Sequence, residues 1–287
     1  MRGLFACLLA ISALLVAACG GEQEAAPAKE PATATAAATA PCAKPSLSLF
    51  AAGKLTIGTD KPAYPPYFED DDPTNGKGFE SAVAYAVARE LGFDKSEVEW
   101  TVVPFNSSYA PGPKKFDFDI NQISITPQRA KRVDFSDPYF EAPQAVVAPA
   151  GSPISNASSL AALADAKIGV QVGTTSLDAV NASIKPKQQP QVFNDSNDTV
   201  RALKGKRVDA IVVDLPTAFY LVGAEVQDAK IVGQFAAPGG DKWGLLLAKG
   251  SKLTPCVNQA LGKLQASGEL KQLQDQWMGG EAAPPLS

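Results

Sequence analysis

Apolar and polar residues follow one another along the chain in a pattern that predicts strands and helices in turn. Residues 54–60 (KLTIGTD) predict a strand, and residues 78–92 (GFESAVAYAVARELG) place apolar side chains at helical spacing before a glycine. Residues 98–105 and 116–125 predict further strands. The segment between them, 106–116, is rich in proline and glycine and predicts a loop.

The same alternation continues through the second half of the chain. Strands are predicted at residues 166–172, 190–193, 209–214, 230–235 and 243–250. Helices are predicted from Thr174 and at residues 196–206, 215–223 and 253–277. This alternation indicates largely parallel sheets with helices on both faces, and ligand sites at the carboxyl ends of the strands. The predicted fold class is therefore α/β.

The chain starts with a different pattern. Arg2 precedes an apolar run from Leu4 to Ala18, which is too short for a comfortable membrane span and is followed by no basic stop signal. It predicts an export signal. The run ends in VAACG, which resembles the bacterial lipobox, so residues 1–18 would be removed and Cys19 would receive a lipid. The alternative is an ordinary secretory signal that is cut at a small-residue site.

Residues 19–46 contain almost no large apolar side chain. Such a segment cannot bury enough surface to offset its ordering entropy, so it predicts a flexible tether. The rest of the chain is long enough for one large domain or two lobes with separate cores. With 45% hydrophobic and 20% charged residues overall, this body is predicted to be globular.

Charge and composition exclude several functions. The formal net charge is -4 and no long basic run occurs, so we expect no nucleic-acid partner. The chain contains no histidine, which rules out Ser-His-Asp and Cys-His catalysis and any histidine-ligated zinc site. No motif predicts a metal site, a nucleotide site or a cofactor.

The four cysteines have different expected fates. Cys7 leaves with the signal and Cys19 carries the lipid, which leaves Cys42 and Cys256. In an oxidising exterior two remaining cysteines most often form a disulfide with each other. The alternative is two unpaired thiols.

Six motifs occur in an order that resembles the extracellular solute-binding proteins of family 3, which serve polar amino acid uptake by ABC transporters. They are LTIGTDKPAYPPYF, GKGFESAVAYAVARELG, ISITPQRAKRVDFSDPYF, KIGVQVGTTS, VDAIVVD and LGKLQASGELKQLQDQWMG. The resemblance covers about residues 50 to 280. It implies a type II periplasmic binding protein fold, in which two α/β lobes are joined by two crossing strands. Residues 47–146 and 236–287 would form lobe 1, and residues 147–235 would form lobe 2.

The resemblance also implies a set of ligand contacts. Arg129 would hold the ligand's α-carboxylate, because a guanidinium offers a planar pair of donors that fits a carboxylate. Alternatively, Arg129 would belong with Lys131 and Arg132 to a solvent-exposed basic surface that pairs with Asp134 and Asp137. Asp214 would take the α-ammonium, and its alternative role is a helix N-cap. Thr174 and Thr175 would complete the carboxylate site at a helix start, which is compatible with N-capping.

Other positions would contact the rest of the ligand. Asn121, Gln122 and Ser124 match the strand end that lines the family's pocket. Asp60, Tyr64 and Phe105 would surround the ligand's side chain, although Asp60 could equally hold its loop.

The loop between Asp60 and Tyr64 is one residue longer than in the family's usual pattern. The aromatic ring that lines the pocket for the ligand's side chain could therefore belong to Tyr64, Tyr67 or Phe68. Residues alone do not decide between them.

The resemblance implies a monomeric, lipid-anchored subunit in the cell envelope, on the outer face of the cytoplasmic membrane or in the periplasm. It would deliver a free, polar amino acid to an ABC permease with its ATPase, with no covalent chemistry. Two alternatives remain: an enzyme on the same fold, such as a cyclohexadienyl dehydratase, and a ligand-sensing subunit of a receptor.

Overall fold

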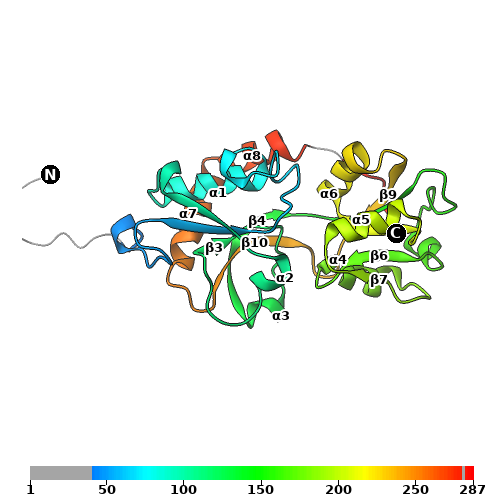
Figure 1. Ribbon diagram of the computed structural model, residues 1–287, viewed down its shortest axis with the longest axis horizontal. Coiled ribbons are helices and arrows are strands. Elements are labelled where there is room, and N and C mark those ends of the chain that lie inside the picture. The colour runs from blue at the N-terminus through cyan, green and yellow to red at the C-terminus, as the bar shows by residue number, and fades with distance from the viewer. Residues whose placement is uncertain (1–40, 280–281) are drawn as a thin grey trace, which may run out of the picture. The chain divides into compact units, whose positions relative to one another are not determined.

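The computed structural model describes residues 41–279 and 282–287. The predicted export signal, Cys19 and most of the predicted tether lie outside the described residues. Figure 1 shows the two sheets around which the described part of the chain is built.

The first sheet has the strand order β2-β1-β3-β10-β4. β1 pairs in parallel with β2 and β3, whereas β10 pairs antiparallel with β3 and β4. Its strands are β1 (Leu55–Thr59), β2 (Val98–Val102), β3 (Phe118–Asp119), β4 (Val133–Glu141) and β10 (Lys242–Ala248).

Three longer helices pack on the first sheet's core: α1 (Phe79–Glu90), α7 (Thr254–Ala266) and α8 (Glu269–Trp277). α1 forms because Val83 and Val87 recur on one face, where both are fully buried. Gly78 precedes it at φ 92°, and a Cβ there would lie 2.4 Å from the carbonyl oxygen of Tyr67. Only glycine fits at this start of the helix.

Short helical turns complete the first lobe: η1 (Lys44–Ser46), η2 (Pro73–Asn75), η3 (Lys95–Glu97), α2 (Phe105–Ser108) and α3 (Pro127–Ala130). α2 corrects part of the loop predicted at 106–116, since its single turn includes the first three of those residues. The turn forms after Pro104, which stands at the N-cap position, where proline's missing N–H costs nothing.

The second sheet has the strand order β7-β6-β8-β5-β9. β6 pairs in parallel with β7 and β8, and β5 pairs antiparallel with β8 and β9. Its strands are β5 (Gln144–Pro149), β6 (Ile168–Gln171), β7 (Gln191–Phe193), β8 (Ala210–Asp214) and β9 (Ala229–Phe235).

Helices cover both faces of this sheet, over two separate groups of buried apolar side chains. They are η4 (Leu160–Leu163), α4 (Thr175–Ala179) continued by η5 (Val180–Ile184), α5 (Ser196–Lys204), and α6 (Leu215–Tyr220) continued by η6 (Leu221–Glu225). The predicted α/β class is confirmed, and the two sheets with their helices are the two lobes that the type II fold implies.

Two crossings connect a strand of one sheet to a strand of the other, at residues 142–143 and 236–241. The first crossing precedes Val146, because all of β5 pairs within the second sheet. The last residues also lie on the second sheet: the carbonyl of Pro284 accepts from Gln234 N (2.8 Å), and Leu286 is buried in that lobe's core. The C-terminal residues thus lie against lobe 2, although the sequence analysis places residues 236–287 in lobe 1.

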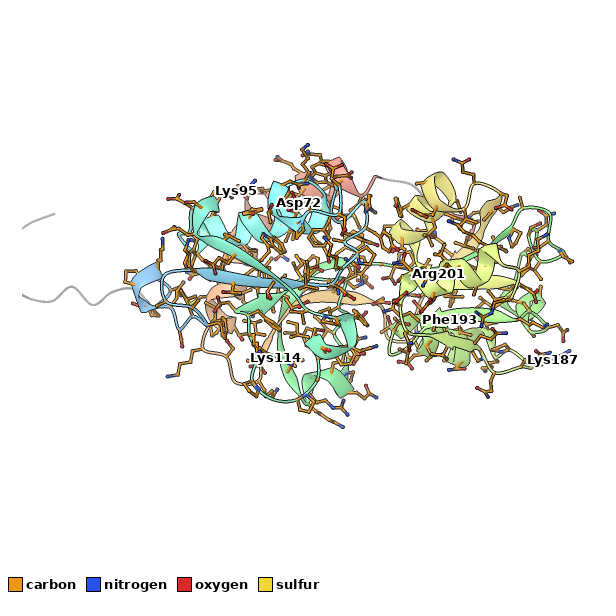
Figure 2. All side chains as sticks on the ribbon, viewed as in Figure 1. Asp72, Lys95, Lys114, Lys187, Phe193 and Arg201 are labelled. Atoms are coloured by element: carbon orange, nitrogen blue, oxygen red, sulfur yellow. A yellow bond between two sulfur atoms is a disulfide. The ribbon has the colours of Figure 1, made fainter. Side chains whose placement is uncertain are left out.

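Cys42 and Cys256 form the predicted disulfide, across 214 positions of sequence. Cys256 belongs to the first core, and Cys42 packs against it. Lys95, Lys187 and Arg201 are exposed charged side chains on the outside of the molecule (Figure 2). Within the described ranges, no helix is long and apolar enough to cross a membrane.

Candidate ligand-binding site

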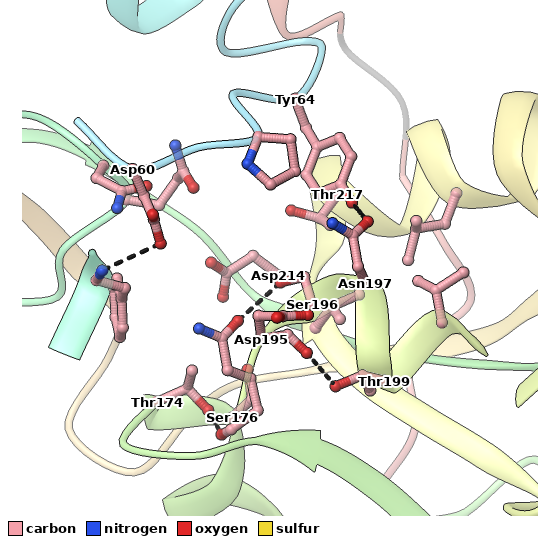
Figure 3. A pocket seen from close by; sticks show the side chains of 18 of the residues that line it. Asp60, Tyr64, Thr174, Ser176, Asp195, Ser196, Asn197, Thr199, Asp214 and Thr217 are labelled. Atoms are coloured by element: carbon pink, nitrogen blue, oxygen red, sulfur yellow. Dashed lines mark hydrogen bonds between the residues drawn. The ribbon is translucent and has the colours of Figure 1, made fainter. Parts of the chain in front are cut away.

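A pocket lies where the carboxyl ends of parallel strands from both sheets meet, next to the two crossings (Figure 3). It brings together nine of the ten predicted ligand-binding residues. Those from the first lobe are Asp60, Tyr64, Phe105, Asn121, Gln122 and Ser124, and those from the second are Thr174, Thr175 and Asp214.

Arg129, the tenth, lies directly behind this lining. Its side chain is 7% exposed, with Nη1 donating to the carbonyl of Ser124 (2.7 Å) and Nη2 to that of Gly173 (2.9 Å). The guanidinium also lies over the rings of Phe105 (5.4 Å) and Tyr109 (4.7 Å). Burial lowers the pKa of Arg129, an effect that neighbouring acidic groups oppose. The guanidinium of Arg129 thus links the two lobes beside the pocket.

Asp214 ends β8 and occupies the N-cap position of α6, but its side chain makes no capping bond. It accepts a hydrogen bond from Gln144 Nε2 (2.5 Å) and lines the pocket instead. Burial raises the pKa of Asp214 well above its usual value, and the nearby carboxylate of Asp241 adds to this rise. Asp214 is therefore not a simple helix cap, and its carboxylate can accept a hydrogen bond from a ligand in the pocket.

Thr174 and Thr175 make different hydrogen bonds at the start of α4. Thr174 caps α4, since its hydroxyl accepts from Leu177 N (3.2 Å). The hydroxyl of Thr175 donates to Asp241 Oδ2 (2.8 Å) and lies 3.1 Å from that of Ser124 in the other lobe. The second lobe thus presents hydroxyls that are already oriented by hydrogen bonds.

Asp60 holds its loop and lines the pocket at the same time. One carboxylate oxygen accepts from Lys61 N (2.7 Å) and the other from Phe105 N (3.0 Å). Both backbone bonds leave lone pairs on the oxygens that face the pocket in Figure 3.

Tyr64 and Phe68 line the pocket, whereas Tyr67 is buried beside it. The Tyr64 hydroxyl donates to Asn197 Oδ1 in the second lobe. Burial raises the pKa of Tyr64 to about 12, so this donor keeps its proton at neutral pH. Tyr67 also reaches the second lobe, with its hydroxyl 2.8 Å from that of Thr217.

Gln122 and Asn121 form the strand end beside the pocket. Gln122 has φ 48°, a strained conformation for a non-glycine residue. Glu80 holds it there by accepting from its backbone N (2.7 Å) and its side-chain amide. Asn121 is 9% exposed and its Nδ2 has no protein partner within the described part of the chain, so a donor remains for a ligand.

Sequence reasoning missed part of the second lobe's wall. Asp195 and Asn197, at the start of α5, line the pocket, as does Ser176 in α4. It also missed Gln144 and Asp241, which support Asp214 from the crossings. An Asx residue that precedes a predicted helix at a strand's carboxyl end is a signal that could have pointed to Asp195.

Comparisons with known proteins give a consistent picture. The model of the bacterial extracellular solute-binding proteins, family 3, matches residues 55–280. The arginine-binding extracellular protein ArtP of Bacillus subtilis (strain 168) is 30% identical over 79% of this chain and 87% of its own length. Among solved structures, an ancestral arginine-binding protein bound to glutamine is similar with a TM-score of 0.68 and 33% identity, over 79% of this chain and 98% of that one.

A further solved structure is relevant to the alternative of an enzyme. It is the ancestral amino acid-binding protein AncCDT-1, a precursor of cyclohexadienyl dehydratase, with a TM-score of 0.64 and 31% identity. The similarity covers 79% of this chain and 95% of that one. This neighbour is itself an amino acid-binding protein.

Proposed function

Since the chain belongs to the bacterial extracellular solute-binding proteins of family 3, we propose that it binds one free, polar amino acid in the pocket between its lobes and delivers it to an ABC permease with its ATPase. The observation that carries the proposal is the charge arrangement of the site. A buried guanidinium at Arg129 and a carboxylate at Asp214 stand beside one pocket, opposite in sign to the two charged groups of an amino acid.

The remaining charges favour an amide or cationic ligand side chain. Asp60 and Asp195 line the pocket in addition to Asp214. The cation Lys61 also lines it, but its ammonium is paired with Asp71 (3.1 Å). A ligand side chain that donates hydrogen bonds or carries positive charge would offset the surplus of carboxylates. The ArtP relative is described as arginine-binding, which agrees with this choice.

Binding without catalysis fits the site better than a dehydratase does. An acid catalyst must present a free carboxyl to the substrate. Both oxygens of Asp60 already accept a backbone N–H bond, which leaves lone pairs that can accept from a ligand rather than a free carboxyl. We therefore infer a binding protein rather than an enzyme, acting as a monomer. Sensing by a receptor would use the same closure of the lobes.

We also propose the lipid anchor at Cys19, with the protein held on the outer face of the cytoplasmic membrane or in the periplasm. The support is the order of the apolar run, small residues and cysteine at residues 4–20.

Calorimetric titration with the twenty amino acids tests the function. The body from residue 41 onward is first partly unfolded and refolded, to remove any carried ligand. We expect one polar group of amino acids to bind with a Kd of about 1 μM or below. If none binds, transport of free amino acids is refuted. Turnover of prephenate or arogenate, lost in Asp60→Asn, would favour the enzyme.

A further inference from the structure

Two carboxylates share one amide beneath the pocket. Asp214 ends β8, and Asp241 immediately precedes β10 in the second crossing. Between them lies Gln144, which is fully buried and whose Nε2 donates to Asp214 (2.5 Å) and to Asp241 (2.7 Å). Its carbonyl oxygen accepts from Ser176 (2.6 Å), which fixes the orientation of the amide.

Asp241 is 1% exposed and incompletely satisfied. Oδ2 accepts from Gln144 and Thr175, but Oδ1 has no hydrogen-bond partner within the described residues. Nor does either carboxylate of the pair form an ion pair there. Two carboxylates that share one buried amide repel each other when both are ionised.

Few positively charged groups lie near enough to offset the negative charges of Asp214 and Asp241. The titratable and charged groups that face Asp214 are Asp241, Arg129, Glu80 and Tyr67. Of these only Arg129 is a cation, and its guanidinium is bound to the carbonyls of Ser124 and Gly173. Arg129 therefore reduces the repulsion without neutralising the pair.

We propose that Asp214 and Asp241 act as one unit that holds a proton until the ligand's ammonium replaces it. The proton leaves the carboxyl for the solvent, and the ammonium then contacts Asp214. Asp241 acts through Gln144 as a positioning residue. The inference rests on the proposed function and adds to it a coupling between ligand binding and proton release.

The pKa of Asp214 agrees with this coupling. Burial raises it first and Asp241 second, whereas the bond from Gln144 and the charge of Arg129 lower it. A bound ammonium would lower it further. Between the ligand-free and ligand-bound pKa values each binding event releases one proton, so affinity rises with pH about tenfold per unit and levels off above the ligand-free value.

Proton counting on the full chain tests the proposal. The amino acid that binds most tightly, with L-arginine tried first, is titrated calorimetrically at several pH values. Each titration is repeated in phosphate and in Tris, which take up protons with different heats. We expect the observed heat to depend on the buffer, with up to one proton released, and affinity to rise with pH. Equal heats in both buffers over the whole range would overturn the inference.

Matched variants assign the effect to the pair. In Asp241→Asn the second charge is lost but the shape is kept, so the proton release and the pH slope should both shrink. Asp228→Asn removes an exposed aspartate of the same lobe and should leave both unchanged. An unchanged slope in Asp241→Asn would contradict the proposal.

Two further outcomes distinguish a failure of the proton-release inference from a failure of the proposed amino acid binding. Should Asp241→Asn fail to fold, carboxyl NMR of the wild type decides: the Asp214 carboxyl must hold a proton without ligand and lose it when the ligand binds, and an Asp214 that is already ionised without ligand would overturn the inference. Binding without proton release defeats only this inference. If no amino acid binds at all, the proposed function fails and the inference fails with it.

Discussion

At the scale of single residues, Arg129 carries the strongest functional claim. Its guanidinium donates to one carbonyl in each lobe, at Ser124 and Gly173, and lies over two neighbouring aromatic rings. These contacts hold the fork in one orientation, so little side-chain entropy is left to lose when a carboxylate binds. The sequence motif predicted this position, but not the contact with the second lobe, which exists only in the folded chain.

Replacing Arg129 tests this claim. Arg129→Ala should weaken amino acid binding by at least about 2 kcal/mol, because a charge-assisted pair of hydrogen bonds is lost. Arg129→Lys keeps the charge without the fork and should lie between wild type and alanine. The exposed Arg132, replaced by alanine, serves as a control. Calorimetry gives the affinities, and wild-type binding by Arg129→Ala would remove Arg129 from the site.

Other residue choices could not be made from sequence. Tyr64, Tyr67 and Phe68 lie in a proline-rich loop that follows neither the helix nor the strand period, so no spacing tells which ring faces the pocket. The contacts decide it: Tyr64 and Phe68 line the pocket, and Tyr67 fills the core between Trp243 and Thr217.

At the scale of elements, the alternating pattern predicted strands and helices well where apolar periodicity is strong. α1, α5, β8 and β10 lie within or close to their predicted ranges. The predicted strand at 116–125 shortens to the two residues of β3, because the chain turns at Gln122 to form the pocket's edge. Local strain at a binding edge is a tertiary feature, which periodicity does not encode.

The start of α1 supports that edge. Glu80 is fully buried and accepts from Gln122 and from the hydroxyl of Tyr139 on β4. In the sequence it looks like a polar residue of an amphipathic helix. Burial raises its pKa from 4.5 to about 7, although three hydrogen bonds oppose the shift.

This shift predicts a pH dependence of stability. Between about pH 4.5 and 7 the native state binds more protons at Glu80 than the unfolded state, so the free energy of unfolding falls as pH rises, by about 3 kcal/mol in all. Glu80→Gln should lack this component. Chemical unfolding of both proteins across the range measures the difference, and parallel curves would contradict the prediction.

At the scale of the whole molecule, the family match covers most of the body but begins at residue 55. The sequence could predict two lobes, because the six motifs can be read directly from the chain. It could predict the disulfide, because only Cys42 and Cys256 remain once Cys7 and Cys19 are assigned. It could not predict that residues 284–287 return to the second sheet, since that short tail carries no periodic pattern.

The proposed anchor makes the protein's location testable. Cys19→Ala should move the chain from the membrane fraction to the soluble fraction, because the lipid would be the only membrane contact. Cys7→Ala, within the predicted signal, is the matched control and should leave the chain in the membrane fraction. Fractionation with immunodetection measures this, and a Cys19→Ala chain that still sediments with membranes would end the lipoprotein hypothesis.

The disulfide has a topological consequence. Both crossings, and with them all strands of the second sheet, lie between Cys42 and Cys256. Residues 144–235 of the second lobe are thus an insertion within a covalently closed ring whose closing bond lies in the first lobe's core. A single cut anywhere in residues 144–235 would open the ring but leave one covalent molecule, with the two chain segments of the first lobe still joined.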